Sequence, residues 1–131
     1  MNKSKLLIIE DEKATLSLLC QFFTDNSYDV IGVDNGLDGI KLIEDPKGHF
    51  NLILTDMVLP DISGAAIISI AKKLYPELPI VAITGWGEHP ESLATEAQAD
   101  LILAKPVELP NLKNLIADLL KKSKFSYSSK K

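Results

Sequence analysis

The sequence predicts an α/β domain in which a doubly wound parallel sheet has helices on both faces. Two observations favour this class. Five short apolar runs of strand length alternate along the chain with segments whose apolar residues recur at helical spacing, which gives five βα units. Four of the runs are apolar through their length, as strands covered on both faces are: KLLIIE, NLILT, PIVAIT and DLILA. Strands and helices that alternate in this way form parallel sheets.

The segments between the strands carry the helical patterns. Three apolar stripes at i, i+3, i+4 and i+7 each predict a helix that packs on the sheet: Leu16, Leu19, Cys20 and Phe23; Ile67, Ile70, Ala71 and Leu74; and Leu112, Leu115, Ile116 and Leu119. A weaker helix is expected to follow Asn35 and to end before Pro46. Ser63 is placed to cap the third helix, and Pro90 suits the first turn of a short fourth helix.

Composition is that of one ordinary folded domain. The chain has 131 residues, enough to bury a core without disulfides, and its net charge of −4 does not favour nucleic-acid or membrane binding. No run approaches a membrane span, and the single cysteine, Cys20, excludes an internal disulfide, so we expect a cytoplasmic protein. We expect the folded domain over residues 1–122 and a polar Ser/Lys-rich tail or linker over residues 123–131.

Polar residues stand at the carboxyl ends of the apolar runs. Glu10 and Asp11 follow the first run, Asp56 ends the third, Thr84 ends the fourth and Lys105 follows the fifth. In open α/β sheets, ligands bind outside the carboxyl ends of the strands, near the point where the strand order reverses. If the first and third strands are neighbours, the carboxylates converge on one small volume, with the lysine and the threonine hydroxyl at its rim.

Such a cluster predicts a cation and phosphoryl chemistry. Carboxylates that lie close together repel one another, and a divalent cation removes the difficulty. All-oxygen ligation suits Mg²⁺, which leaves coordination positions for phosphate oxygens, and a lysine ammonium suits the same phosphate. A carboxylate can act as a nucleophile and become an aspartyl phosphate. The set therefore predicts phosphoryl transfer to Asp56, with Mg²⁺ and Lys105 neutralising the developing charge.

Four sequence blocks, each at a strand end, occur in order: LIIEDE, LILTDMVLPDISG, VAITG and LAKP. Together they resemble the signature blocks of response-regulator receiver domains, over roughly Lys5 to Lys121. The resemblance implies a flavodoxin-like (βα)5 fold with strand order 2-1-3-4-5. It also implies two-component signalling, in which a histidine kinase or a phosphotransfer protein phosphorylates an aspartate. The domain would then switch conformation and signal to a downstream partner or output domain that the sequence does not identify. Its only catalysis would be its own phosphorylation and dephosphorylation, so we do not expect an enzyme.

The resemblance assigns the metal ligands by position. Asp56 would be the phosphoacceptor, and Asp11 and Asp56 would bind Mg²⁺ directly. Glu10 would bind it through a water molecule, and Val58 through its backbone carbonyl. No other cofactor is implied.

The remaining roles fall at the fourth and fifth strands. Thr84 would turn its hydroxyl to the phosphate, Lys105 would pair with it, and the peptide bond before Pro106 would be cis. The family commonly has an aromatic residue three positions before this lysine, and here that position is Ile102. The usual threonine–aromatic switch is therefore not expected in its ordinary form.

Two large apolar residues flank the predicted reaction site. Val58 lies two residues after Asp56, and Trp86 lies two residues after Thr84. In the family these positions influence how readily water attacks the phosphoryl group. We predict that both side chains restrict that water and make the phosphorylated form long-lived.

Two other functions stay open at this point. The first is an interaction module that signals without phosphorylation, which Ile102 alone favours. The second is a hydrolase with an aspartyl nucleophile, which usually has a second acid where this chain has Val58. A dinucleotide loop at GWG is excluded because Pro90 occupies the place of the third glycine.

Overall fold

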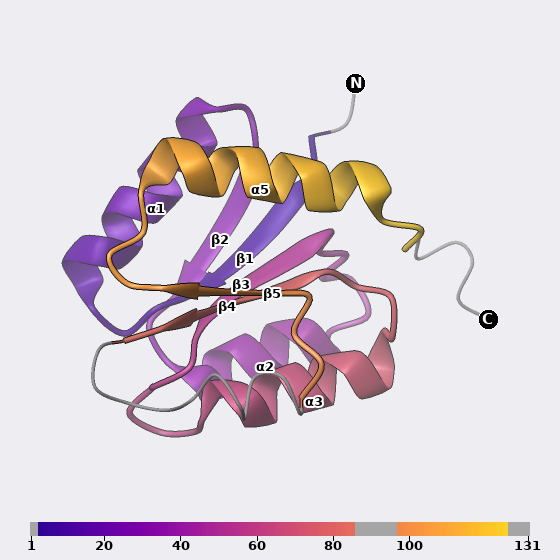
Figure 1. Ribbon diagram of the computed structural model, residues 1–131. Coiled ribbons are helices and arrows are strands. Elements are labelled where there is room, and N and C mark those ends of the chain that lie inside the picture. Colours follow the sequence, from indigo (N-terminus) through magenta and orange to yellow (C-terminus); the bar gives the residue numbers. More distant parts are fainter. Residues whose placement is uncertain (1–2, 86–96, 126–131) are drawn as a thin grey trace.

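The computed structural model describes residues 3–85 and 97–125 and confirms the predicted α/β class (Figure 1). The strands are β1 (Lys5–Ile9), β2 (Asp29–Val33), β3 (Leu52–Asp56), β4 (Ile80–Thr84) and β5 (Leu101–Ala104). The helices of the described part, labelled as in Figure 1, are α1 (Lys13–Asp25), α2 (Gly36–Glu44), α3 (Gly64–Leu74) and α5 (Leu109–Lys122). The helix predicted after Pro90 lies outside the described residues.

All strand pairs in the sheet are parallel, and the order is β2-β1-β3-β4-β5. This is the order that the family resemblance implies. In the register, Ile9 lies opposite Thr55, and Asp56 lies opposite Ile83. The chain runs from β1 to β2 on one side and from β3 to β5 on the other. The order therefore reverses between β1 and β3, whose carboxyl ends lie side by side.

Helices α1 and α5 cover one face of the sheet, and α2 and α3 cover the other (Figure 1). Successive residues of a strand point to opposite faces. In β1, Leu6 and Ile8 therefore pack on the α1 and α5 side, whereas Leu7 and Ile9 pack on the α2 and α3 side. The predicted stripes supply the helical half of both cores, with buried residues Leu19, Phe23, Ile67, Ala71, Leu112 and Ile116. Each fully buried Leu, Ile or Phe side chain contributes about 1.5–3 kcal/mol relative to exposure.

Local capping explains where two of the helices begin. The side chain of Asn35 accepts a hydrogen bond of 2.9 Å from the backbone N–H of Asp38 in α2. Ser63 accepts one of 3.2 Å from the N–H of Ala66 in α3, as predicted. Cys20 lies on the predicted stripe of α1 and is half-buried.

The fifth strand is less deeply buried than β1, β3 and β4, because in the described part of the chain it has a neighbouring strand on one side only. The described residues place β5 at the edge of the sheet, paired with β4, and its residues Leu101 to Leu103 are only half-buried. Its side chains nevertheless pack on both faces, because Ile102 contacts the core on the α2 and α3 side, and Leu101 and Leu103 contact the core on the α1 and α5 side. An apolar run has the same appearance at an edge as in the middle of a sheet, so periodicity does not distinguish the two places.

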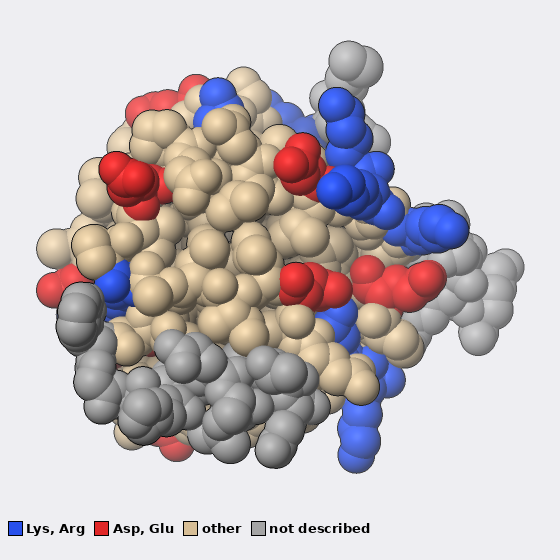
Figure 2. All heavy atoms as spheres, in the orientation of Figure 1, with Lys and Arg blue, Asp and Glu red and all other residues tan. Residues whose placement is uncertain are grey.

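Part of the predicted tail is attached to the domain. The ring of Phe125 packs edge-on against Tyr75, with ring centroids 5.7 Å apart. Lysine side chains gather where α5 ends, and the last turn of that helix carries Lys121 and Lys122 (Figure 2). In residues 3–85 and 97–125, no helix combines the length and the hydrophobicity that crossing a bilayer requires.

Candidate functional site

The carboxyl ends of β1 and β3 bring together the acids that the sequence predicts. Glu10 directly follows β1, and Asp56 is the last residue of β3. Carboxylate oxygens of Glu10, Asp11 and Asp56 all lie within 4.8 Å of one another. Glu10 is 2% exposed and Asp56 is 5% exposed, whereas Asp11 faces solvent. The cluster is thus buried on one side and open on the other.

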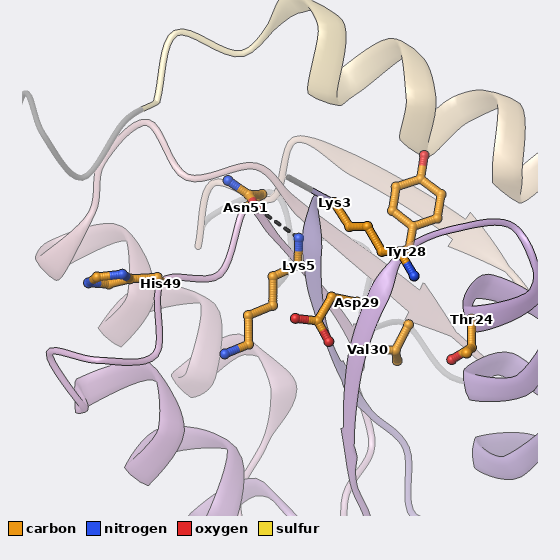
Figure 3. Close-up of a pocket in the computed structure, with 8 residues that line it drawn as sticks. All are labelled: Lys3, Lys5, Thr24, Tyr28, Asp29, Val30, His49 and Asn51. Atoms are coloured by element: carbon orange, nitrogen blue, oxygen red, sulfur yellow. Dashed lines mark hydrogen bonds between the residues drawn. The ribbon is translucent and has the colours of Figure 1, made fainter. Parts of the chain in front are cut away.

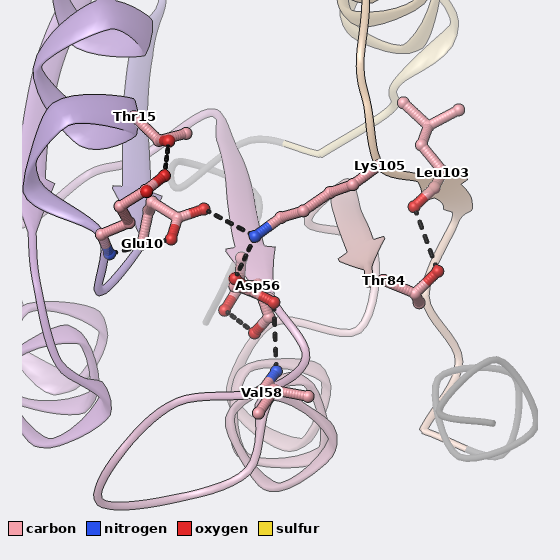
Figure 4. Close-up of polar contacts among 9 residues, drawn as sticks. Glu10, Thr15, Asp56, Val58, Thr84, Leu103 and Lys105 are labelled. Carbon is pink, nitrogen blue, oxygen red and sulfur yellow. Dashed lines mark hydrogen bonds and ion pairs between the residues drawn. The ribbon is translucent and has the colours of Figure 1, made fainter. Parts of the chain in front are cut away.

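Lys105 reaches across from the end of β5 and lies between the two buried acids (Figure 4). Its Nζ is 2.8 Å from Oδ2 of Asp56 and 3.4 Å from Oε1 of Glu10. The peptide bond from Lys105 to Pro106 is cis, as the resemblance implies. The lysine ammonium compensates buried negative charge that is otherwise costly.

The electrostatic effects at the cluster oppose one another. Burial raises the pKa of the Glu10 carboxyl above its ordinary value of 4.5, and the neighbouring charge of Asp56 adds to this rise. Burial lowers the pKa of Lys105, but the hydrogen bond and attraction to Asp56 outweigh it, so the pKa lies above the ordinary 10.5. Lys105 is therefore charged at neutral pH. One lysine faces the three clustered acids, so the site keeps an excess of negative charge.

The loop after β3 folds back on Asp56. The backbone N–H of Val58 donates to Oδ1 of Asp56 at 3.1 Å, and the N–H of Gly64 donates to the carbonyl of Met57 at 2.9 Å. A Cβ on Gly64 would lie 2.4 Å from the carbonyl oxygen of Asp56 and 2.6 Å from Cα of Met57. Only glycine allows α3 to begin against this peptide. The Val58 side chain points outward and is 46% exposed.

Thr84 is fully buried, but its hydroxyl is not directed at the acids. Its Oγ1 donates to the backbone carbonyl of Leu103 in β5 at 3.4 Å, on the side away from Asp56 (Figure 4). The hydroxyl would have to rotate about χ1 to meet a phosphate. Ile102 is half-buried on β5 and packs toward α2 and α3. Trp86 lies outside the described residues.

The donor set suits Mg²⁺. Carboxylate oxygens are hard ligands, and a site with a few carboxylates on one side and solvent on the other matches an ion that keeps several waters. Glu10, Asp11 and Asp56 offer such oxygens within one small volume. The residues present therefore fit the metal that the sequence predicts.

Comparison with known proteins decides the family. The family model described as "Response regulator receiver domain" matches residues 6–117. The chain belongs to the response-regulator receiver family. It is a receiver domain of two-component signalling, and its acidic pocket is compatible with aspartate phosphorylation and Mg²⁺ binding.

The receiver domain is similar to regulators of other organisms. It is 35% identical over 120 residues to the transcriptional regulatory protein CusR of Escherichia coli K12, with 90% of this chain and 52% of CusR covered. The chain thus spans about half the length of that relative. The receiver domain protein (CheY-like) of Methanospirillum hungatei JF-1 has a TM-score of 0.86 and 30% identity, over 92% of this chain and 96% of that one.

A third comparison concerns the fold alone. The response regulator TrrA of Thermotoga maritima, solved in complex with Mg(2+)-BeF, has a TM-score of 0.78 at 23% identity. The match covers 88% of this receiver domain and 98% of that chain.

A second hollow lies at the opposite end of the sheet, where the strands begin. It encloses about 710 Å³ and is lined partly by Lys3, Lys5 and Asp29 (Figure 3). The two lysine side chains point in different directions, and Nζ of Lys5 lies 5.0 Å from the ring centroid of Phe50. The charges of this hollow do not converge, so it does not resemble a binding site.

One contact at the acidic edge was not predicted from the sequence. The carboxylate of Asp61, in the loop after β3, accepts hydrogen bonds from the backbone N–H groups of Gly36 and Leu37 at the start of α2. The sequence offers only a weak signal for it, because an aspartate after Pro60 is typical of an ordinary turn.

Proposed function

We propose that this receiver domain accepts a phosphoryl group on Asp56, in a Mg²⁺-dependent reaction, from the phosphohistidine of a sensor kinase or a phosphotransfer protein. The observation that carries the proposal is the placement of the Asp56 carboxylate. It lies 2.8 Å from the Lys105 ammonium and within 4.8 Å of the carboxylates of Glu10 and Asp11. This arrangement supports the role of nucleophile for Asp56, of phosphate-binding cation for Lys105 and of metal ligands for the acids.

In the transfer step, a carboxylate oxygen of Asp56 forms a bond to phosphorus while the bond from phosphorus to the donor nitrogen breaks. The imidazole that leaves takes up a proton from solvent. The Lys105 ammonium lies 2.8 Å from the Asp56 carboxylate. As negative charge moves to the phosphoryl group, this ammonium would shift from the carboxylate to a phosphoryl oxygen. Thr84 would turn its hydroxyl from the carbonyl of Leu103 to another phosphoryl oxygen.

Glu10, Asp11, Asp56 and the backbone carbonyl of Val58 would hold Mg²⁺. When bound, the ion supplies positive charge that stabilises the phosphoryl oxygens in the transition state. The complex of the fold relative TrrA with Mg(2+)-BeF supports a metal in this role. The excess of acid over lysine at the site supports it independently.

We also propose that the product is a signal that an effector outside this domain reads. CusR, of which the chain covers about half, is a transcriptional regulatory protein, and this supports an effector that lies in the remainder of a longer chain. Phosphorylation would shift the population of two conformations of the domain and thereby change what it binds.

The test is the intact mass of the protein after incubation with Mg²⁺ and acetyl phosphate. We expect the increment of one phosphoryl group, lost in Asp56→Asn and lost when EDTA removes Mg²⁺. Asp29→Asn, at the opposite edge of the sheet, is the matched control and should retain the increment. A folded wild-type protein that never gains the increment would overturn the proposal in favour of a module that signals without phosphorylation. An increment that persists in Asp56→Asn would place the acceptor elsewhere.

A further inference from the structure

The loop that follows Asp56 is tied to α2 by one side chain. Oδ1 of Asp61 accepts the backbone N–H of Gly36 at 2.9 Å, and Oδ2 accepts that of Leu37 at 2.9 Å. These hydrogen bonds lower the pKa of Asp61 below its ordinary 3.8, so the carboxylate is charged at neutral pH. A negative charge at the N-terminus of a helix also meets the positive end of the helix dipole.

Side-chain packing also connects this loop to α2. Ile62, the residue after Asp61, packs directly on the first turn of α2, because a Cβ on Gly36 would lie 2.0 Å from Cγ2 of Ile62. Ile62 also packs against the core between the sheet and α3. The loop and the start of α2 are therefore in close contact and cannot move apart without the loss of both hydrogen bonds and packing.

The helix also has a cap of its own. Asn35 caps α2 by accepting the N–H of Asp38 at 2.9 Å. The first three amide groups of α2 are thus divided between two acceptors, one within the helix segment and one from the loop. Asp61 does more than cap a helix, since it connects two elements that are distant in sequence.

The same loop carries a proposed metal ligand. Val58 lies three residues before Asp61, and its N–H is bonded to Oδ1 of Asp56. Gly64 closes the base of the loop through its bond to the Met57 carbonyl. The loop therefore has three attachments: to the Asp56 carboxylate, between its own two ends, and to the start of α2. The third of these attachments depends on Asp61.

We propose that Asp61 is a positioning residue, which holds residues 57–63 against α2 and so fixes the backbone carbonyl of Val58 for Mg²⁺. This inference rests on the proposed function, because it takes that carbonyl as a ligand. A ligand that is held in place loses less freedom when the metal binds, which raises affinity. By linkage, metal that binds better to the attached loop must in turn strengthen the attachment to α2.

The first test compares two capping variants of the same helix by calorimetric titration with Mg²⁺. Asp61→Ala removes the attachment between loop and helix, and Asn35→Ala removes a cap within the helix. Both should lower the free energy of unfolding. We expect only Asp61→Ala to weaken Mg²⁺ binding, by about tenfold, in the range seen when groups that orient metal ligands are removed. Asp61→Asn keeps one acceptor oxygen and should lie between wild type and Asp61→Ala.

The second test measures hydrogen exchange of the wild-type protein, with and without Mg²⁺, at the amides of Gly36 and Leu37. We expect Mg²⁺ to slow exchange at both amides, and expect no such slowing in Asp56→Asn. This measurement needs no Asp61 variant, so it decides the question even where Asp61→Ala fails to fold.

The outcomes separate the two proposals. Two results would overturn the role of Asp61 and leave phosphorylation of Asp56 intact. One is wild-type Mg²⁺ affinity in Asp61→Ala, and the other is hydrogen exchange at Gly36 and Leu37 that Mg²⁺ does not change. Equal weakening in Asp61→Ala and Asn35→Ala would also overturn it, because the order of α2 alone would then explain the effect. A wild-type protein that binds no Mg²⁺ would overturn both proposals.

Discussion

The receiver domain has one lysine–aspartate pair where the strands begin, called the amino edge, and another where the strands end, called the carboxyl edge. The two pairs differ in what surrounds them. At the amino edge, Nζ of Lys72 lies 2.7 Å from Asp100, and it also donates to the carbonyl of Leu78 at 2.9 Å. Asp100 in turn accepts the N–H of Ile80. At the carboxyl edge, Lys105 lies 2.8 Å from Asp56, but it shares its charge with a second buried acid, Glu10.

The difference lies in charge balance. At the amino edge, one lysine meets one aspartate and the remaining bonds go to backbone groups, so the pair joins the end of α3 to the starts of β4 and β5. At the carboxyl edge, three acids surround one lysine, so negative charge is left over, which suits a divalent cation. Under the proposed function, ion pairs of nearly equal length therefore serve stability in one place and chemistry in the other.

The largest expected effect is that of Lys105→Ala on phosphorylation. Loss of the ammonium removes positive charge where the phosphoryl oxygens develop negative charge, so the rate with acetyl phosphate should fall roughly 100-fold. Mg²⁺ should at the same time bind more tightly, because the lysine no longer competes for Asp56 and Glu10. Time courses of intact mass and a Mg²⁺ titration measure the two effects. A wild-type phosphorylation rate would show that the two edges do not differ in function.

Lys72→Ala is the matched variant at the amino edge. It leaves Asp100 and the carbonyl of Leu78 without their charged donor, so the free energy of unfolding should fall by about 2 kcal/mol. Denaturant titration measures this loss. Below the unfolding transition, phosphorylation should proceed at the wild-type rate, and a slower rate would contradict the separation of the two edges.

Thr84→Val sharpens the comparison within the carboxyl edge. Its hydrogen bond to Leu103 is long, at 3.4 Å, so removal of the hydroxyl should change the free energy of unfolding by less than about 1 kcal/mol. Phosphorylation should slow by about tenfold if the hydroxyl turns to the phosphate. Thr55→Val is the control, because the Thr55 hydroxyl donates to the Asp56 carbonyl oxygen, not to its carboxylate. A rate equal to wild type in Thr84→Val would exclude the rotation.

The smallest expected effect concerns the lifetime of the phosphorylated form. Val58 is 46% exposed beside Asp56, where it can restrict the approach of water. Val58→Asn should speed dephosphorylation by several-fold, because a small polar side chain no longer restricts the approach of the attacking water. The double variant that also replaces Trp86 by a small polar residue should be faster still. Loss of the phosphoryl mass increment after removal of the donor measures the rate, and an unchanged rate in the double variant would contradict the prediction.

Much of the site was predictable because parallel strands end at the same edge. Glu10, Asp56 and Lys105 follow apolar runs, and their convergence needs only the strand order that the family resemblance implies. The cap at Ser63 was also predictable, because a short polar side chain before an apolar stripe satisfies the first amides of a helix.

Other features depend on three-dimensional contacts that a linear pattern does not encode. The attachment of Asp61 to α2 exists because α2 and α3 lie side by side on one face of the sheet. The direction of the Thr84 hydroxyl is a rotamer choice, which sequence does not specify. Phe125 packs on Tyr75 although the chain around it is polar, a contact that composition does not indicate. The exact boundary of the domain stays a prediction.

Gly64 has a consequence for protein design. Because α3 begins in contact with the peptide of Asp56, a Cβ at residue 64 would lie 2.4 Å from the Asp56 carbonyl oxygen. A designer who transplants the acceptor into another α/β scaffold cannot move the aspartate alone. The unit to transplant is the segment 56–64, which includes the glycine that closes the loop. The new scaffold must also supply a helix start whose backbone N–H groups donate to Asp61.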